Sequence, residues 1–127
     1  MRKSKINISG FKIGTAENRE GLTGVTVILA PDGGATAGVD VRGCAPGTRE
    51  TDLLDPRKTV QKIHAVVLSG GSAFGLEAAS GCVKYLAEQG VGFPIGNVCV
   101  PIVCSAVLFD LMIGDEKAYP DLLMGYE

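Results

Sequence analysis

Residues 66–76 read VVLSGGSAFGL, and this stretch decides the fold because a strand pattern changes there into a helix pattern. The apolar run ends at a glycine pair, and Ser72 is placed to cap the helix that follows. The first backbone N–H groups of a helix lack partners inside it, so they can hold an anion, a carboxylate or a polarised carbonyl oxygen. The stretch therefore predicts a binding loop, although it carries no complete set of catalytic groups.

The composition suits one modest domain of 127 residues. Hydrophobic residues make up 46% of the chain, 18 glycines come in addition, and tryptophan is absent. This apolar excess indicates that some side chains lie against a surface that the chain does not supply, although a glycine- and alanine-rich α/β protein would give the same excess. The net charge is −2, and Lys and Arg are scattered, so we expect no nucleic-acid partner.

The chain lacks the signals of a membrane, secreted or metal-binding protein. No apolar run approaches the roughly 18 residues that cross a bilayer, and the start has no apolar secretion signal, so we expect a cytoplasmic protein without a membrane partner. The only histidine, His64, is interpreted as a strand-edge residue, with a catalytic base as the alternative. We expect no metal, no cofactor and four free thiols, because zinc-type and redox-type spacings are missing among Cys44, Cys82, Cys99 and Cys104.

The strand patterns predict a mixed sheet. The predicted strands are residues 6–15 (one bulged strand or two short ones), 23–29, 35–41, 63–68 and 98–111. Turns are predicted at 31–34 and 93–96, and the first of them would join two strands into a hairpin.

The helix patterns predict one long amphipathic helix over residues 73–89, which ends at Gly90. A short helix is expected at 51–54 after a loop at 43–49. Asp121 has the position of an N-cap for a last helix, and we expect that the chain is cut inside this helix.

The glycine loop matches none of three known glycine-containing sequence motifs. No Lys followed by Ser or Thr comes after Gly75, as a P-loop requires, and the esterase pattern Gly-x-Ser-x-Gly is missed by one residue. A dinucleotide-binding Gly-x-Gly-x-x-Gly is also absent. Ser72 is thus interpreted as a helix cap rather than a nucleophile, and the loop serves either close packing or ligand binding. Arg42 and Arg49, in a second glycine-rich loop, either pair with neighbouring carboxylates or clamp the carboxylate of a ligand.

Long segments resemble the DmpA-type aminopeptidases, the peptidase family S58, which includes β-peptidyl aminopeptidases and the nylon-oligomer amidase. These segments are GVDVRGCAPGTRETDLL (38–54), HAVVLSGGSAFGLEAA (64–79), VPIV (100–103) and VLFDL (107–111). They occur in the family's order over essentially the whole chain. The resemblance implies the α/β class, as part of an αββα sandwich like that of N-terminal-nucleophile hydrolases. Cys104 and Ser105 depart from the Pro-Ala of close relatives, and Cys44 replaces a Gly.

The resemblance also implies a mechanism. Members cleave themselves before a Ser or Thr, which becomes the N-terminus of a small subunit and attacks amide or ester bonds with help from its own amine. That nucleophile lies downstream of the matched region, so we expect no catalytic residue in this chain. The substrate-binding residues implied by position are Ser69, Gly70, Gly71, Ser72, Val100 and Phe109.

We therefore expect residues 1–127 to be the N-terminal part of the large subunit of an S58-type hydrolase, inactive alone. The expected partners are the C-terminal segment or small subunit of the same hydrolase, a short peptide or amide substrate, and further copies in a homo-oligomer. An alternative function is a non-catalytic module that holds a small anion at the Gly70–Gly71 loop, and nucleotide binding there is a third option.

Overall fold

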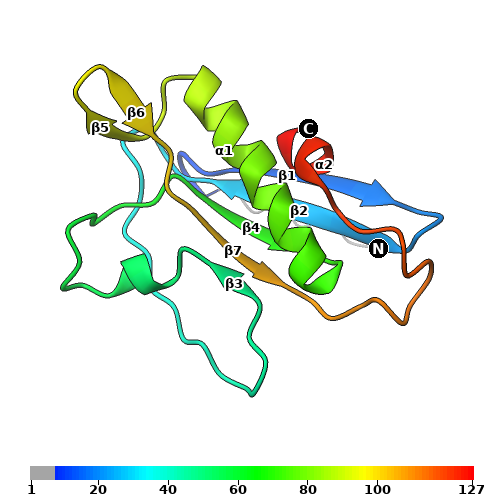
Figure 1. The fold of residues 1–127 in the computed structure, drawn as a ribbon. Helices are drawn as coiled ribbons and strands as arrows, with labels where there is room; N and C mark the ends of the chain where they lie inside the picture. The colour runs from blue at the N-terminus through cyan, green and yellow to red at the C-terminus, as the bar shows by residue number, and fades with distance from the viewer. Residues whose placement is uncertain (1–7) are drawn as a thin grey trace.

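A five-stranded mixed sheet forms the centre of the computed structural model, which describes residues 8–127 (Figure 1). Its strands, in the spatial order β1-β2-β4-β7-β3, are β1 (Lys12–Asn18), β2 (Thr23–Leu29), β4 (Ala65–Ser69), β7 (Val103–Val107) and β3 (Thr48–Arg49). β4 and β7 run parallel, and the other neighbours are antiparallel. The predicted α/β class with a mixed sheet is confirmed.

The predicted strand over 23–29 is β2, with the same bounds. Its hairpin partner is β1, and the expected returning strand over 35–41 is wrong. β1 and β4 pair with the two edges of β2, so no edge is left for a third partner. Within that segment, Ala35 forms only an isolated bridge with Ile63.

Three further strand predictions need correction. β1 begins at Lys12 rather than near residue 6, and residues 6 and 7 lie outside the described part of the chain. The expected strand over 98–111 is divided, because Pro101 has no N–H to donate to a ladder. Its first piece, β6 (Val98–Val100), pairs with β5 (Phe93–Ile95), so residues 93–95 form a strand where a turn was expected.

The long helix is present but begins with a tighter turn. The 3₁₀ helix η2 (Ser72–Glu77) leads directly into α1 (Ala78–Glu88), and Gly90 follows with a positive φ of 68°, as the cap prediction requires. The short helix η1 (Asp52–Leu54) is also present. The Asp121 side chain accepts a hydrogen bond from the backbone N–H of Met124, so the predicted cap of α2 (Leu122–Tyr126) is confirmed.

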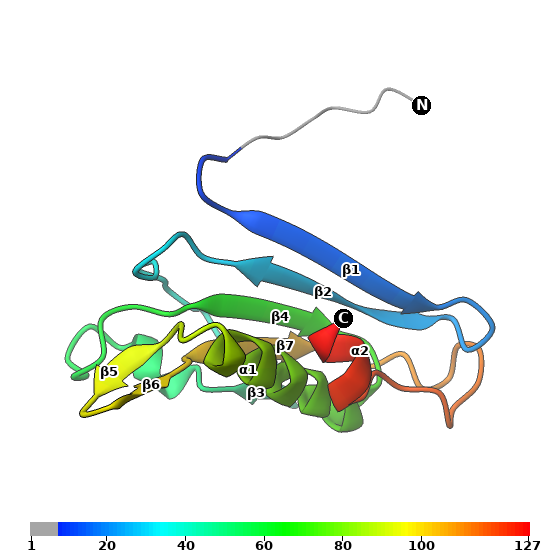
Figure 2. The ribbon, with the colours of Figure 1, turned by 90° about the horizontal axis from the view of Figure 1, so that it is seen from above.

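Both α-helices lie side by side on one face of the sheet (Figures 1 and 2). The core between them and the sheet consists of Val25, Ala65, Val67, Ala78, Ala79, Cys82, Leu86 and Val103. Alternate residues of the same strands point to the other face. There, Leu68 of the central strand β4 is 46% exposed and Ile13 of β1 is 65% exposed. This face of the sheet is open. In residues 8–127, no helix has the length and apolar character needed to span a membrane.

Candidate functional site at the end of the central strands

The Gly70–Gly71 turn connects β4 to η2 and has a strained backbone. Gly71 adopts a positive φ of 80°, and the next residue, Ser72, has a φ of 54°. A positive φ is uncommon for a residue with a side chain and is held in place only by surrounding contacts. At this turn the contacts come from Asp110, Leu108 and Tyr119.

The N–H groups of this turn bond to the protein itself. Gly71 donates to the carboxylate Oδ1 of Asp110 at 2.6 Å, and Ser72 donates to the carbonyl of Leu108 at 2.9 Å. Gly71 occupies the N-cap position of η2, and no side chain caps this helix. The predicted cap by Ser72 is therefore wrong, and so is the expectation that these two N–H groups point outward to an anion. The Asp110 carboxylate takes the place that an anion would need.

Close packing explains the glycines. A Cβ on Gly70 would collide with the Asp110 carboxylate and the Thr23 hydroxyl, and a Cβ on Gly71 would lie 2.5 Å from that of Tyr119. A Cβ on Gly75 would collide with the carbonyl oxygen of Gly70. The glycine pattern thus serves strand-to-helix packing, which was one of the two interpretations of the loop.

Phe109 lies beside this turn, because the segment after β7 is hydrogen-bonded to it in both directions. Leu108 donates its N–H to the carbonyl of Ser69 at 2.8 Å and accepts the N–H of Ser72. Phe109 itself is 72% exposed. Of the six predicted binding residues, the structure therefore brings Phe109 together with the turn over 69–72.

Val100 lies elsewhere. It ends β6, before the first residue of β7, whereas Phe109 follows the last residue of β7 (Figure 1). The length of β7 separates the two positions, and Val100 is 41% exposed at its end of the sheet. Its predicted role in substrate binding stays a prediction.

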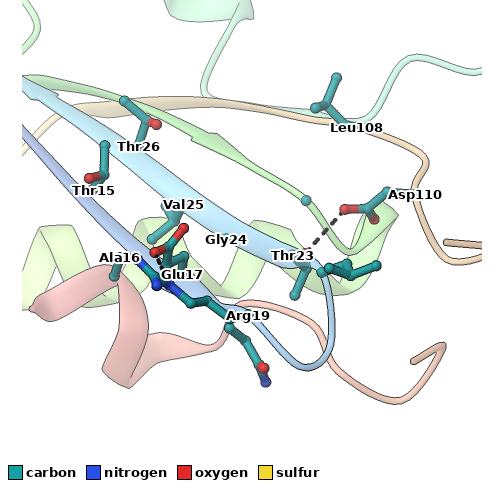
Figure 3. A pocket seen from close by; sticks show the side chains of 13 residues that line it. Thr15, Ala16, Glu17, Arg19, Thr23, Gly24, Val25, Thr26, Leu108 and Asp110 are labelled. Carbon is teal, nitrogen blue, oxygen red and sulfur yellow. Dashed lines mark hydrogen bonds and ion pairs between the residues drawn. The ribbon is translucent and has the colours of Figure 1, made fainter. Parts of the chain in front are cut away.

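Two adjoining cavities open beside the turn. One, of about 720 Å³, lies between the β1–β2 hairpin, Gly70, Leu108 and Asp110. Figure 3 shows Thr23 and Asp110 hydrogen-bonded to each other at one end of it, with Glu17 and Arg19 on the β1 side. The second, of about 290 Å³, is lined by Leu68, Ser69 and neighbouring residues of β2 and β7. A small ligand would therefore meet charged, hydroxyl, backbone and apolar groups at this end of the strands.

Within residues 8–127, neither of the hydroxyl groups that form hydrogen bonds at this turn, Ser69 and Thr23, is bonded to a histidine; that of Thr23 donates to the Asp110 carboxylate at 3.1 Å. Ser69 is buried, and its Oγ donates to the carbonyl of Gly70 at 3.0 Å. His64 is 6% exposed, its Nδ1 accepts the N–H of Ile102 at 3.1 Å, and burial lowers its pKa. None of the hydrogen bonds found over residues 8–127 joins His64 to a hydroxyl group. The interpretation of His64 as a strand-edge residue is confirmed.

The cysteines are unpaired, and the two arginines of the second loop bond to groups of this chain. All four cysteines are free, and burial raises the pKa of Cys82 to about 11. Within the described part of the chain, no three His, Cys, Asp or Glu side chains gather as a metal site would require. Arg42 pairs with Asp40, as one interpretation of its loop expected. Arg49 instead donates to the hydroxyl of Ser80 on α1 at 2.7 Å.

Asp110 is the residue of this site that sequence reasoning missed. Its position directly after an apolar segment was visible, but its partner was not. Its role follows from the parallel pairing of β4 and β7, which the sequence does not show, since the carboxyl ends of two parallel strands meet at one edge of a sheet.

Comparison with known proteins identifies the family. The model of peptidase family S58 matches residues 5–120, and the chain belongs to this family. An uncharacterized aminopeptidase of Mycobacterium leprae is 52% identical over 103 residues, which cover 81% of this chain and 28% of the relative. A 6-aminohexanoate-oligomer endohydrolase of Agromyces is 36% identical over 121 residues, which cover 95% of this chain and 31% of the relative. The chain thus spans about a third of the length of such relatives.

Proposed function

We propose that this chain is the N-terminal part of the large subunit of a self-processing S58-type hydrolase that cleaves short peptides or amides. The nucleophile, a Ser or Thr at a newly formed N-terminus, comes from outside these 127 residues. Family membership supports hydrolase chemistry, and the names of the relatives, aminopeptidase and oligomer endohydrolase, support an amide bond as the target.

The observation that carries the proposal is a lined site in which, over residues 8–127, no hydroxyl group is bonded to a histidine. The turn at 69–72, Leu108 and two adjoining cavities form one continuous region, and Phe109 follows Leu108 in the chain, but the hydroxyl of Ser69 donates to the carbonyl of Gly70. Ser attacks an amide only when a neighbouring base accepts its proton, and the only His is bonded to Ile102. In this proposal the chain binds and orients substrate, while a second segment performs the attack.

The open face of the sheet supports the need for a second segment. Leu68 lies on the central strand of five and is still 46% exposed. A sheet normally buries one or both faces against another layer, because exposed apolar surface costs free energy. A second sheet on this face would complete the αββα sandwich that the family resemblance implies. The proposed partner is therefore the C-terminal segment of the same hydrolase, and the assembled pairs form a homo-oligomer.

The alternative of an anion-binding module finds no such support. The Gly71 N–H already faces the Asp110 carboxylate, which would repel an added anion.

The test compares the chain alone with the chain produced together with the C-terminal remainder of the hydrolase. That remainder is taken from the gene downstream or, as a surrogate, from the Mycobacterium leprae relative. Turnover is measured on amino-acid p-nitroanilides, short peptide amides and 6-aminohexanoate oligomers, and mass spectrometry follows cleavage of the remainder.

We expect no turnover by the chain alone, and turnover together with a fragment that begins at Ser or Thr in the assembled hydrolase. Replacing that Ser or Thr by Ala is the matched control for contaminating peptidases. Sustained turnover by the highly purified 127-residue chain would contradict the proposal, as would an assembled pair that neither cleaves itself nor hydrolyses an amide.

A further inference from the structure

The Asp110 carboxylate joins three segments that are distant in sequence. Oδ1 accepts the N–H of Gly71 at 2.6 Å. Oδ2 accepts the Thr23 hydroxyl at 3.1 Å, as Figure 3 shows. Asp110 follows β7, Gly71 follows β4, and Thr23 begins β2, so one side chain connects the ends of three strands.

Gly70 makes room for this carboxylate. A Cβ at position 70 would overlap both the Asp110 Oδ2 and the Thr23 hydroxyl. Hydrogen bonds to a carboxylate are stronger than those between neutral groups. Over residues 8–127, no Lys, Arg or His forms an ion pair with Asp110, and its carboxylate accepts hydrogen bonds from the backbone N–H of Gly71 and the hydroxyl of Thr23.

The same contacts determine where Phe109 lies. The chain is attached to the turn through both backbone groups of Leu108, immediately before Phe109, and through the carboxylate of Asp110, immediately after it. Phe109 is held between two points of attachment while its ring stays 72% exposed. A stiff backbone with an exposed aromatic ring is an arrangement suited to contact with a ligand rather than to core packing.

We propose that Asp110 is a positioning residue of the hydrolase. It holds the Gly70–Gly71 turn and Phe109 in a fixed relation, so that substrate bound between them meets the nucleophile in a productive orientation. This inference rests on the proposed function. Loss of orientation lowers the rate even when the reacting groups are unchanged, by about a hundredfold for a displacement near 1 Å.

The test uses the assembled hydrolase and the variants Asp110→Ala, Asp110→Asn and Thr23→Val. Asp110→Ala removes both acceptors, and we expect kcat/KM to fall about tenfold to a hundredfold, mainly through kcat. Asp110→Asn keeps Oδ1 as the acceptor for Gly71, and its amide N–H can donate to the Thr23 oxygen. We expect it to stay within about twofold of the unchanged protein and Thr23→Val to be intermediate.

Two controls separate positioning from stability. Asp115→Ala changes an exposed carboxylate in the same connection, and we expect unchanged kinetics. Gly81→Ala lies between the two helices, and we expect a lower melting temperature with kcat/KM within about twofold of the unchanged protein.

The inference would be overturned if Asp110→Ala kept the kinetics of the unchanged hydrolase, or if Gly81→Ala lost as much kcat at an equal loss of stability. Equal loss in Asp110→Asn and Asp110→Ala would also overturn it, since the charge itself would then be required. No turnover by the unchanged assembly would refute the proposed function instead, which distinguishes the two failures.

Discussion

Gly81 of α1 and Gly125 of α2 meet backbone to backbone. A Cβ on Gly81 would lie 2.8 Å from the carbonyl carbon of Gly125 and 2.6 Å from the backbone nitrogen of Tyr126. A Cβ on Gly125 would in turn collide with the carbonyl of Ala78. The short helix α2, five residues long, is therefore stabilised by contact with α1 rather than by its own hydrogen bonds.

Because of this contact, we expect alanine at position 81 to destabilise the protein, the opposite of its usual effect in a helix. In a helix interior, Gly→Ala normally stabilises by about 1 kcal/mol. For Gly81→Ala we expect destabilisation by about 1–3 kcal/mol, because the added methyl group forces the two helices apart. Urea unfolding measures this change in the free energy of unfolding. Gly38→Ala is the control, since a Cβ there meets nothing within 4 Å. A more stable Gly81→Ala variant would contradict the contact.

Gly70 and Asp110 are expected to be coupled in stability. Gly70→Ala introduces a methyl group onto the carboxylate, with an expected cost of about 1–3 kcal/mol. In an Asp110→Ala background the same change should cost less, because one of the two colliding groups is gone. A double-mutant cycle by urea unfolding of the isolated chain gives the coupling free energy. Strict additivity would show that the two groups do not meet.

The exposed thiols should react and the buried ones should not. Cys44 and Cys99 are exposed, whereas burial raises the pKa of Cys82 to about 11. Burial and the charge of Glu50 also raise the pKa of Cys104. Because the thiolate is the reactive form, we expect a fast phase of two thiols with a disulfide reagent near pH 8, lost in Cys44→Ser/Cys99→Ser. A third fast thiol in the native protein would be inconsistent with this burial.

Burial of His64 predicts a loss of stability in acid. Its pKa is lowered from 6.5 in the folded chain, so the unfolded chain takes up the proton first. The contribution of neutral His64 is therefore complete above about pH 6.5 and decreases as the pH falls through the folded pKa. His64→Asn keeps an acceptor for Ile102 but cannot titrate. The difference in unfolding free energy between the two proteins should change with pH, and a constant difference would refute the assignment.

The open sheet face predicts separate effects on folding and on assembly. Leu68→Asp places a charge at a site that is 46% exposed, so the stability of the isolated chain should change by only about 0.5 kcal/mol. Its complementation by the C-terminal remainder should be lost, because a charge would be buried between layers. Leu123→Asp, at a residue of α2 that is 62% exposed, is the control and should assemble normally. If Leu68→Asp and Leu123→Asp assembled equally well, the open face of the sheet would not be part of the interface.

Local patterns predicted the elements whose determinants are local. The β-branched run of β2, the apolar face of α1 with Gly90 after it, and the Asp121 cap each depend on residues within one or two turns of the chain. The prediction of a hairpin over 35–41 was wrong because the competing partner, β4, lies about 40 residues further along.

The site was predicted only in part for the same reason. Ser72 has the sequence of an N-cap, but Gly71 occupies that position and no side chain caps η2. The N–H of Gly71 instead donates to the carboxylate of Asp110, 39 residues away. The proximity of Phe109 to the turn depends on β4 and β7 being parallel neighbours, and a family resemblance rather than periodicity pointed to it. Long-range pairing decides which polar groups meet, and single-sequence patterns do not contain it.

The carboxylate of Asp110 fills the volume that a side chain at position 70 would occupy. The two positions therefore cannot change independently during evolution. A homologue that acquires a side chain in place of Gly70 must first have lost or relocated the carboxylate of Asp110. A homologue that loses this carboxylate but keeps the glycine is left with an unfilled gap. Alignments of the family should show the pair inherited or replaced together, as correlated substitutions do for groups in direct contact.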